Sequence, residues 1–426
     1  MLNAFKGAAT RLLLWSQKYT KTDMRYVAHG GFWMSLNLVL SSAVSVALAI
    51  VFANLLPKEV YGYYKYVLSV GSLFGFLTFT GMNAAVSQAV ARGQDGAFPY
   101  AVRIQLKWNL LLAVVLSGVG IYYLLNGSQK LGIPLLFLAI GSPLAAAYTT
   151  YGAYLGGKKD FKTASQYSTA AVVLYALTMC AAVLITKDVR WLAATYAISS
   201  AVIAFLFHRL TVRKYQPQGL EEEERKKMLT LGKHLSLTNV LGSLAQYVDS
   251  IVVFKFGDAT ELAIYAFANV IPDRLRGFMK RALGIVAPKI ADKTPREAYV
   301  SLGLRIAQGL IVGAALAAVY WLLSPFVFKY IFPQYVVSTF YSQLIALGFL
   351  LVIPATYSSQ VMQAQHLYTP LYVGTTIGNL FRIFAIIAGG FFGGVIGVIV
   401  ARLAANVFAT ALTLLLIRRD LRKLTA

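Results

Sequence analysis

Charged residues are scarce in this chain of 426 residues, at 13% of the total. That is half of the roughly 25% usual in soluble proteins. Hydrophobic residues make up 58%, and the mean hydropathy is +0.64. A soluble core has no room for so much apolar side chain, whereas a lipid bilayer does. The composition therefore excludes a soluble enzyme, a disordered protein and a secreted disulfide scaffold.

Cysteine and histidine are almost missing as well. The one cysteine, Cys180, lies in an apolar run, so it forms no intrachain disulfide and we expect an inert packing residue. The four histidines are scattered without the spacing of metal ligands, and the sequence has no Walker loop. We therefore expect no metal, no cofactor, no catalytic group and no ATP hydrolysis by this chain.

Long apolar runs, by contrast, are abundant. A transmembrane helix needs about 20 mostly apolar residues, and twelve runs meet that length. They cover approximately residues 31–55, 62–83, 104–126, 132–156, 164–185, 190–210, 234–257, 261–287, 300–323, 339–366, 370–391 and 393–417. The predicted fold class is an all-α polytopic membrane protein with about twelve transmembrane helices.

Lysine and arginine predict the orientation, because short cytoplasmic loops are enriched in them. The two termini and the loops on their side of the membrane contain 25 lysines and arginines, whereas the loops on the opposite side contain 6. This places both termini in the cytoplasm and favours the plasma membrane (the inner membrane of a bacterium). Residues 1–28 carry the apolar stripe Phe5, Leu12, Trp15 and Tyr19, and are predicted to be an amphipathic segment on the cytoplasmic leaflet, without a cleavable signal peptide.

The two halves of the chain repeat each other. At an offset of 201 residues, Gly31 aligns with Gly232 and Ser35 with Ser236, and after one insertion Tyr63 aligns with Tyr265. We therefore predict two six-helix bundles, residues 29–210 and 234–418, joined by a cytoplasmic linker at 211–233 and followed by a tail at 419–426. With six helices each, the bundles should be related by a pseudo-two-fold axis along the membrane normal, the frame of an alternating-access carrier.

Eight basic residues lie inside the apolar runs, where each costs about 2.5–3.5 kcal/mol and usually faces a cavity or a partner. The run 261–287 holds half of them, Arg274, Arg276, Lys280 and Arg281. Together with Asp273 they fall within about 160° of one helix face. That face extends from mid-membrane to the cytoplasmic mouth. A basic, partly dry cavity suits an anion of more than one charge, such as a phosphate or diphosphate. The predicted headgroup-binding residues are Arg274, Arg276, Lys280, Arg281, Lys65 and Arg382.

Each of these residues also has a purely structural interpretation. Lys280, Arg281, Lys65 and Arg305 can snorkel to the interface, and Arg382 and Arg402 can form a structural tie between the last two predicted helices, 370–391 and 393–417. Asp249 and Asp273 are the acids well inside the runs. They are candidates for ion coupling or for a counter-charge, and the alternative is a salt bridge to the basic face.

Two segments carry a family resemblance. The first has Pro57, Glu59, Tyr61, Gly62, Gly81 and Asn83, with Leu56 where glycine is usual, and the second has Asp249, Gly257, Glu261 and Tyr265. Over residues 28–418 the chain resembles the Wzx-type oligosaccharide-lipid flippases of the MOP superfamily. The resemblance implies transport of a polyprenyl-diphosphate-linked oligosaccharide to the outer leaflet. In the lipid II relatives, arginines of helices 1, 2 and 8 line the cavity; here Lys65 and Arg274 or Arg276 fit, but helix 1 has Asn37 and Asn54 instead.

The expected partners are thus the lipid-linked glycan and membrane lipids, with glycan polymerase or ligase machinery as a further candidate. We expect no nucleic acid partner and a monomer. Two rival functions are an exporter of small solutes or drugs from the same superfamily, and a membrane glycan polymerase or ligase. The first needs acids in the cavity, and the second needs acid–base groups on a long outer loop; the largest outer connection, 324–338, has neither carboxylate nor histidine.

Overall fold

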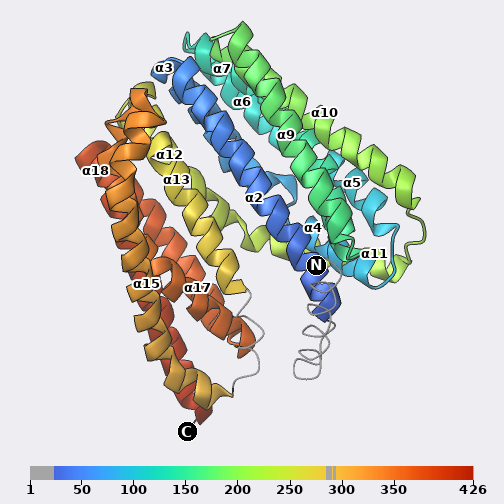
Figure 1. The fold of residues 1–426 in the computed structure, drawn as a ribbon. Helices are drawn as coiled ribbons and strands as arrows, with labels where there is room; N and C mark the ends of the chain where they lie inside the picture. The colour runs from blue at the N-terminus through green and yellow to red at the C-terminus, as the bar shows by residue number, and fades with distance from the viewer. Residues whose placement is uncertain (1–23, 285–289, 291–293, 426) are drawn as a thin grey trace, which may run out of the picture.

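The computed structural model describes residues 24–284, 290 and 294–425, and its regular elements in this part of the chain are all helical (Figure 1). The predicted all-α membrane fold is therefore confirmed. The first half contains α2 (Met24–Leu55), α3 (Lys58–Leu73), η1 (Phe74–Thr78), α4 (Met82–Ala91), α5 (Ala97–Trp108), α6 (Leu110–Leu125), α7 (Gln129–Tyr148), α8 (Tyr151–Gly157), α9 (Phe161–Ile185) and α10 (Val189–Tyr215). The second contains α11 (Glu222–Thr238), α12 (Val240–Phe256), α13 (Ala259–Gly284), α15 (Pro295–Tyr330), η2 (Pro333–Tyr335), α16 (Ser338–Ala346), α17 (Phe349–Ala364) and α18 (Tyr368–Thr425).

Within the described residues, nine helical segments are long and apolar enough to cross a membrane, and the bent pair Lys58–Thr78 and Met82–Ala91 makes a tenth. The predicted run 261–287 falls on α13. This helix is not among the segments just counted, because it carries a charged face. The last two predicted runs share α18. Gly394 has φ 53° and ψ −136°, and Gly389 and Gly397 approach so closely that a Cβ on Gly397 would lie 1.9 Å from the Gly389 carbonyl oxygen. α18 is therefore a hairpin of two antiparallel helices.

The second span is bent by 50° between η1 and α4. Phe79 adopts φ 54°, and its buried ring lies 5.2 Å from that of Trp108. Two residues later, the Gly81 amide donates a hydrogen bond of 2.9 Å to Ser236 Oγ of α11. The break thus lies where the span meets a neighbouring helix of the second half.

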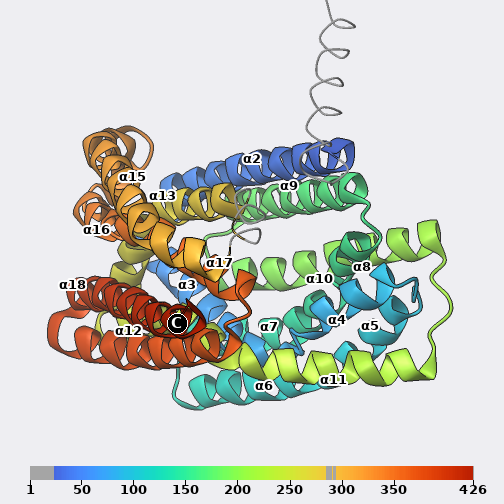
Figure 2. The same cartoon turned by 90° about the horizontal axis from the view of Figure 1, so that it is seen from below.

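The two halves form the limbs of a V (Figure 1). Helices α2 to α10 pack against one another in one limb, and α12 to α18 pack in the other; the view from below shows α2 beside α9 and α12 beside α18 (Figure 2). Between the limbs, α3 packs against α12 and α13, and α11 packs against α4. The bundle boundaries and the pseudo-two-fold axis stay predictions, and residues 1–23 of the predicted amphipathic segment lie outside the described residues.

The limbs meet at the narrow end of the V, where α3 and α13 begin. A Cβ at Gly62 would lie 1.7 Å from the carbonyl oxygen of Ala259, so glycine is required for this approach. Beside it, the ring of Phe267 lies 4.7 Å from that of Tyr61 and 4.0 Å from that of Tyr335. The structure is therefore closed at the narrow end, and the limbs diverge toward the end where the C-terminus lies (Figure 1).

Candidate substrate cavity between the two halves

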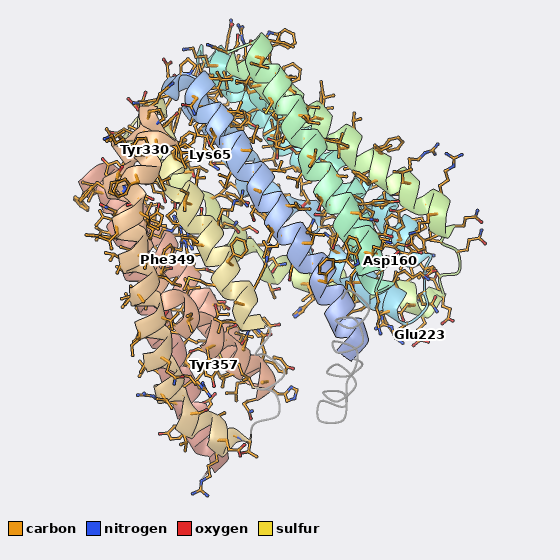
Figure 3. The ribbon with its side chains drawn as sticks, in the orientation of Figure 1. Lys65, Asp160, Glu223, Tyr330, Phe349 and Tyr357 are labelled. Carbon is orange, nitrogen blue, oxygen red and sulfur yellow. The ribbon has the colours of Figure 1, made fainter. Side chains whose placement is uncertain are left out.

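A cavity of about 980 Å³ lies between α2, α3 and α9 of the first half and α12, α13 and α18 of the second. Six basic and two acidic side chains line it, which gives its wall a net charge of +4. Lys65 lies toward the narrow end of the V (Figure 3), and Lys280 lies near the other end of α13. The cavity therefore presents positive charge along most of its depth.

Four of its six cations form no ion pair with any acid of the described residues. They are Lys65, Arg274, Lys280 and Arg382. Arg382, from the first helix of α18, has a buried Nε without a hydrogen-bond partner among these residues. Unpaired cations and orphaned N–H groups at a cavity wall are suited to bind an anion with several oxygens.

Arg276, unlike these cations, forms an ion pair with an acid of its own helix. Its Nη2 donates to Asp273 Oδ1 at 2.6 Å, one helical turn away, and its side chain is 15% exposed. Its Nε is buried and has no partner within the described part of the chain. Asp273 pairs with one end of this guanidinium, and the buried Nε–H at the other end is left without a partner there.

Arg402, from the second helix of α18, is the centre of a buried network. Its Nη1 donates to Asn269 Oδ1 at 2.8 Å, to Tyr265 OH at 3.0 Å and to Asp249 Oδ2 at 3.3 Å. Its Nη2 lies 3.6 Å from Asp273 Oδ1, and Tyr265 OH donates to Asp249 Oδ2 at 2.8 Å. The network ties α18 to α12 and α13, which is a structural role for Arg402 different from the predicted tie between the last two apolar runs.

Tyr265 and Asn269 were not predicted from the sequence as site residues. Their spacing of four residues on α13 places them on one helix face. Asp273 follows after four more residues, so Tyr265, Asn269 and Asp273 form one polar stripe on a largely apolar part of α13. This stripe is the sequence signal that could have identified Tyr265 and Asn269 as site residues.

The other predicted residues are placed as follows. Lys65, Arg274, Arg276, Lys280, Arg382, Asp249 and Asp273 all line the cavity. Arg281 does not, although it lies next to Lys280; it is exposed beyond the lining. Arg305, on α15, hydrogen-bonds to Gln308 and does not line the cavity.

Helix α2 contributes no charged contact. It presents Val44, Leu48 and Phe52, together with Ser45 and Ala49, to the cavity. Asn37 instead donates to α9, to the Ser165 carbonyl at 3.1 Å and Thr169 Oγ1 at 2.9 Å. Asn54 donates to its own helix at the Ile50 carbonyl. The first helix therefore forms an apolar wall in this protein.

A sequence model described as "Polysaccharide biosynthesis protein" matches residues 27–286, more than half of the chain. The chain belongs to this polysaccharide biosynthesis family. The matched segment contains all of the cavity lining except the two arginines of α18. A comparison with curated protein sequences found no match.

Solved structures of the MOP superfamily share the fold of this family member. An inward-facing multidrug-resistance MATE transporter is 17% identical, with a TM-score of 0.64 over 90% of this chain and 95% of that one. The lipid II flippase MurJ in an inward-closed conformation is 16% identical, with a TM-score of 0.62 over 89% and 86%. A MOP transporter from Pyrococcus furiosus is 16% identical, with a TM-score of 0.57 over 93% and 96%. These likenesses establish the fold of a multi-pass membrane transporter.

Proposed function

We propose that this protein moves a polyprenyl-diphosphate-linked oligosaccharide from the cytoplasmic to the outer leaflet of the plasma membrane by alternating access. The observation that carries the proposal is the net charge of +4 on the wall of a cavity between the two halves. Membership of the polysaccharide biosynthesis family supports the class of substrate.

The geometry suggests how the headgroup binds. Arg274 and Lys280 lie exposed on α13, toward the wide end, and meet the diphosphate first. Arg276 and Arg382 then offer their orphaned Nε–H groups, and Lys65 lies furthest toward the narrow end. The distribution of basic loops supports a wide end that faces the cytoplasm, and the prenyl chain remains in lipid.

The alternating-access step needs the narrow end to open while the wide end closes. At the narrow end α3 contacts α12 and α13, most closely at Gly62, while α4 and α11 are already in contact in this structure. We propose that the α3–α13 contact opens as the limbs close at the wide end, so that the cavity faces one leaflet at a time.

A cation exporter is the strongest rival within the superfamily. Such a protein needs acids that remain free in the cavity, but Asp249 is occupied by Arg402 and Tyr265, and Asp273 by Arg276 and Arg402. The four remaining cations repel a positively charged solute. The balance of charge therefore favours an anionic substrate.

The experiment is a flipping assay in proteoliposomes with a fluorescent polyprenyl-diphosphate-linked disaccharide. We expect Arg274→Ala combined with Arg276→Ala to slow flipping at least tenfold, because the pair supplies guanidinium contacts to the headgroup. Arg281→Ala and Arg305→Ala are matched controls, since both remove an arginine outside the cavity lining and should flip at the wild-type rate. Unchanged flipping by the double variant would refute the site.

A further inference from the structure

A second cavity, without charge, adjoins the basic one. It has a volume of about 340 Å³ and lies between α3, η1, α7 and α10 on the side of the first half and α12 on the other. Its lining within the described residues contains no Lys, Arg, Asp, Glu or His. Its polar atoms are hydroxyls and one carboxamide, which makes it chemically distinct from the cavity described above.

Several of these polar groups lack a protein partner. The side chains of Ser72, Ser142, Gln246 and Tyr247 make no hydrogen bond with any residue that the structure describes. Thr80 Oγ1 is fully buried and also has no partner there. Of these five residues, Thr80 alone has a buried polar atom without a partner, which costs about 1–3 kcal/mol. Gln246 is exposed and Ser72, Ser142 and Tyr247 are half-buried, so their polar groups are open to a ligand. The cavity is therefore equipped for a ligand with many hydroxyls.

The two cavities share a wall. Gln246 and Tyr247 of α12 line both of them. On α3, Ser69 lines the basic cavity, and Ser72 lines the uncharged one less than a turn further along. A headgroup whose phosphates lie in the basic cavity can therefore extend past Tyr247 into the uncharged cavity.

We propose that the uncharged cavity is a sugar subsite, which takes the neutral sugar next to the diphosphate of the lipid-linked substrate. This inference rests on the proposed function. At about 30 Å³ for each water-sized group, the volume holds roughly eleven such groups, on the order of one hexose. Tyr247 supplies both a ring face for the apolar side of the sugar and a hydroxyl for its rim.

The absence of charge from the described lining also gives the subsite a preference. A sugar carboxylate placed here would lose its hydration without meeting a cation, and burying an unpaired charge is costly. The subsite therefore selects neutral hexoses or N-acetylhexosamines over uronic acids at the first position of the glycan.

The test compares two probes for each variant in nanodiscs: a polyprenyl diphosphate that carries one N-acetylhexosamine, and the bare polyprenyl diphosphate. Ser142→Leu fills the uncharged cavity, and Ser142→Ala keeps it open. We expect Ser142→Leu to weaken binding of the glycosylated probe about tenfold and to change binding of the bare probe less than twofold. Ser142→Ala should stay within threefold of wild type for both probes.

The outcomes separate the two claims. Retained binding of the bare lipid shows that Ser142→Leu is folded. If Ser142→Leu leaves the ratio of the two affinities unchanged, or if the wild type binds both probes equally, the subsite is refuted while the proposed function stands. If the wild type binds neither probe, the proposed function fails and the subsite fails with it. Arg274→Ala with Arg276→Ala should weaken both probes equally.

Discussion

Arg402 is the most heavily hydrogen-bonded side chain of the basic cavity, and its neighbours decide its role. Its side chain is 12% exposed and that of Asp249 is 8% exposed. A buried ion pair is itself a weak source of stability, but removal of one partner leaves a buried charge without compensation. We therefore expect Arg402 to matter for the integrity of the second half, whereas the exposed Arg274 is a proposed contact of the ligand.

We predict that Arg402→Met lowers the free energy of unfolding by about 3–5 kcal/mol, because Asp249 is left buried with only Tyr265 as a side-chain donor. Thermal unfolding of the purified protein measures this. Arg402→Met combined with Asp249→Asn should recover much of the loss, since the uncompensated charge is gone. Arg274→Met is the control and should unfold as the wild type does; equal unfolding of the two single variants would contradict the prediction.

Asp160 has a structural role outside the membrane-spanning segments, at the start of α9 (Figure 3). It accepts hydrogen bonds from the Thr163 amide at 3.0 Å, from Thr163 Oγ1 at 2.7 Å and from Tyr215. Burial alone would raise the pKa of its carboxyl group, but these hydrogen bonds and Lys214 outweigh burial and hold the pKa well below its usual value. The side chain is a helix cap that also joins α9 to α10.

We predict that Asp160→Ala costs about 1–2 kcal/mol of stability at pH 7, the range for loss of an N-cap. Because the folded-state pKa is depressed, the contribution is complete above the unfolded-state pKa and declines as the pH falls below about 4. Unfolding of wild type and variant at pH 7 and at pH 3.5 checks this. A difference between the two proteins that grows on acidification would contradict it.

At the scale of elements, hydropathy was enough to locate the membrane runs, because the bilayer imposes a length that any sequence must satisfy. The breaks within them were not predictable. The bend after η1 depends on Phe79 and on the bond from Gly81 to Ser236, which are contacts between distant segments. The basic face of α13 was predicted from helical periodicity, but a single helix does not reveal that the lining ends at Lys280, nor that Arg402 approaches from α18.

Gly62 illustrates the same limit. In the sequence it was visible only as part of a motif. The structure shows why a glycine is needed there: the backbone of α13 lies directly against α3 at this residue. We predict that Gly62→Leu prevents the narrow end from closing, so that the population shifts toward a cavity open at that end. A cysteine introduced as Ser45→Cys in a Cys180→Ala background should then be labelled several-fold faster from the narrow-end side by a membrane-impermeant maleimide.

The control for this variant is Gly118→Leu, since a Cβ at Gly118 meets nothing within 4 Å. It adds the same side chain to a transmembrane helix without touching the contact between the halves. Labelling of Ser45→Cys from the narrow-end side should remain at the level of the protein in which both Gly62 and Gly118 are kept. Equal labelling of the two leucine variants would show that the α3–α13 contact does not control access.

At the scale of the whole molecule, the charge of the cavity and the charge of the proposed substrate bear on the driving force. A diphosphate diester carries about two negative charges, and each charge moved across the membrane corresponds to about 2.3 kcal/mol per 100 mV. The wall charge of +4 lowers the cost of bringing the diphosphate to mid-membrane. An inside-negative potential then favours movement of the anion outward.

We therefore predict that membrane potential alone drives net flipping. In proteoliposomes without a proton or sodium gradient, a potassium diffusion potential of about 100 mV, negative on the wide-end side, should shift the final distribution of the labelled lipid toward the other leaflet. Two charges correspond to about 5 kcal/mol, more than a thousandfold at equilibrium. Reversal of the potential should reverse the shift. A distribution indifferent to the potential but sensitive to an imposed pH gradient would instead assign the driving force to a coupled proton, for which Asp249 and Asp273 are the two acids of the cavity lining.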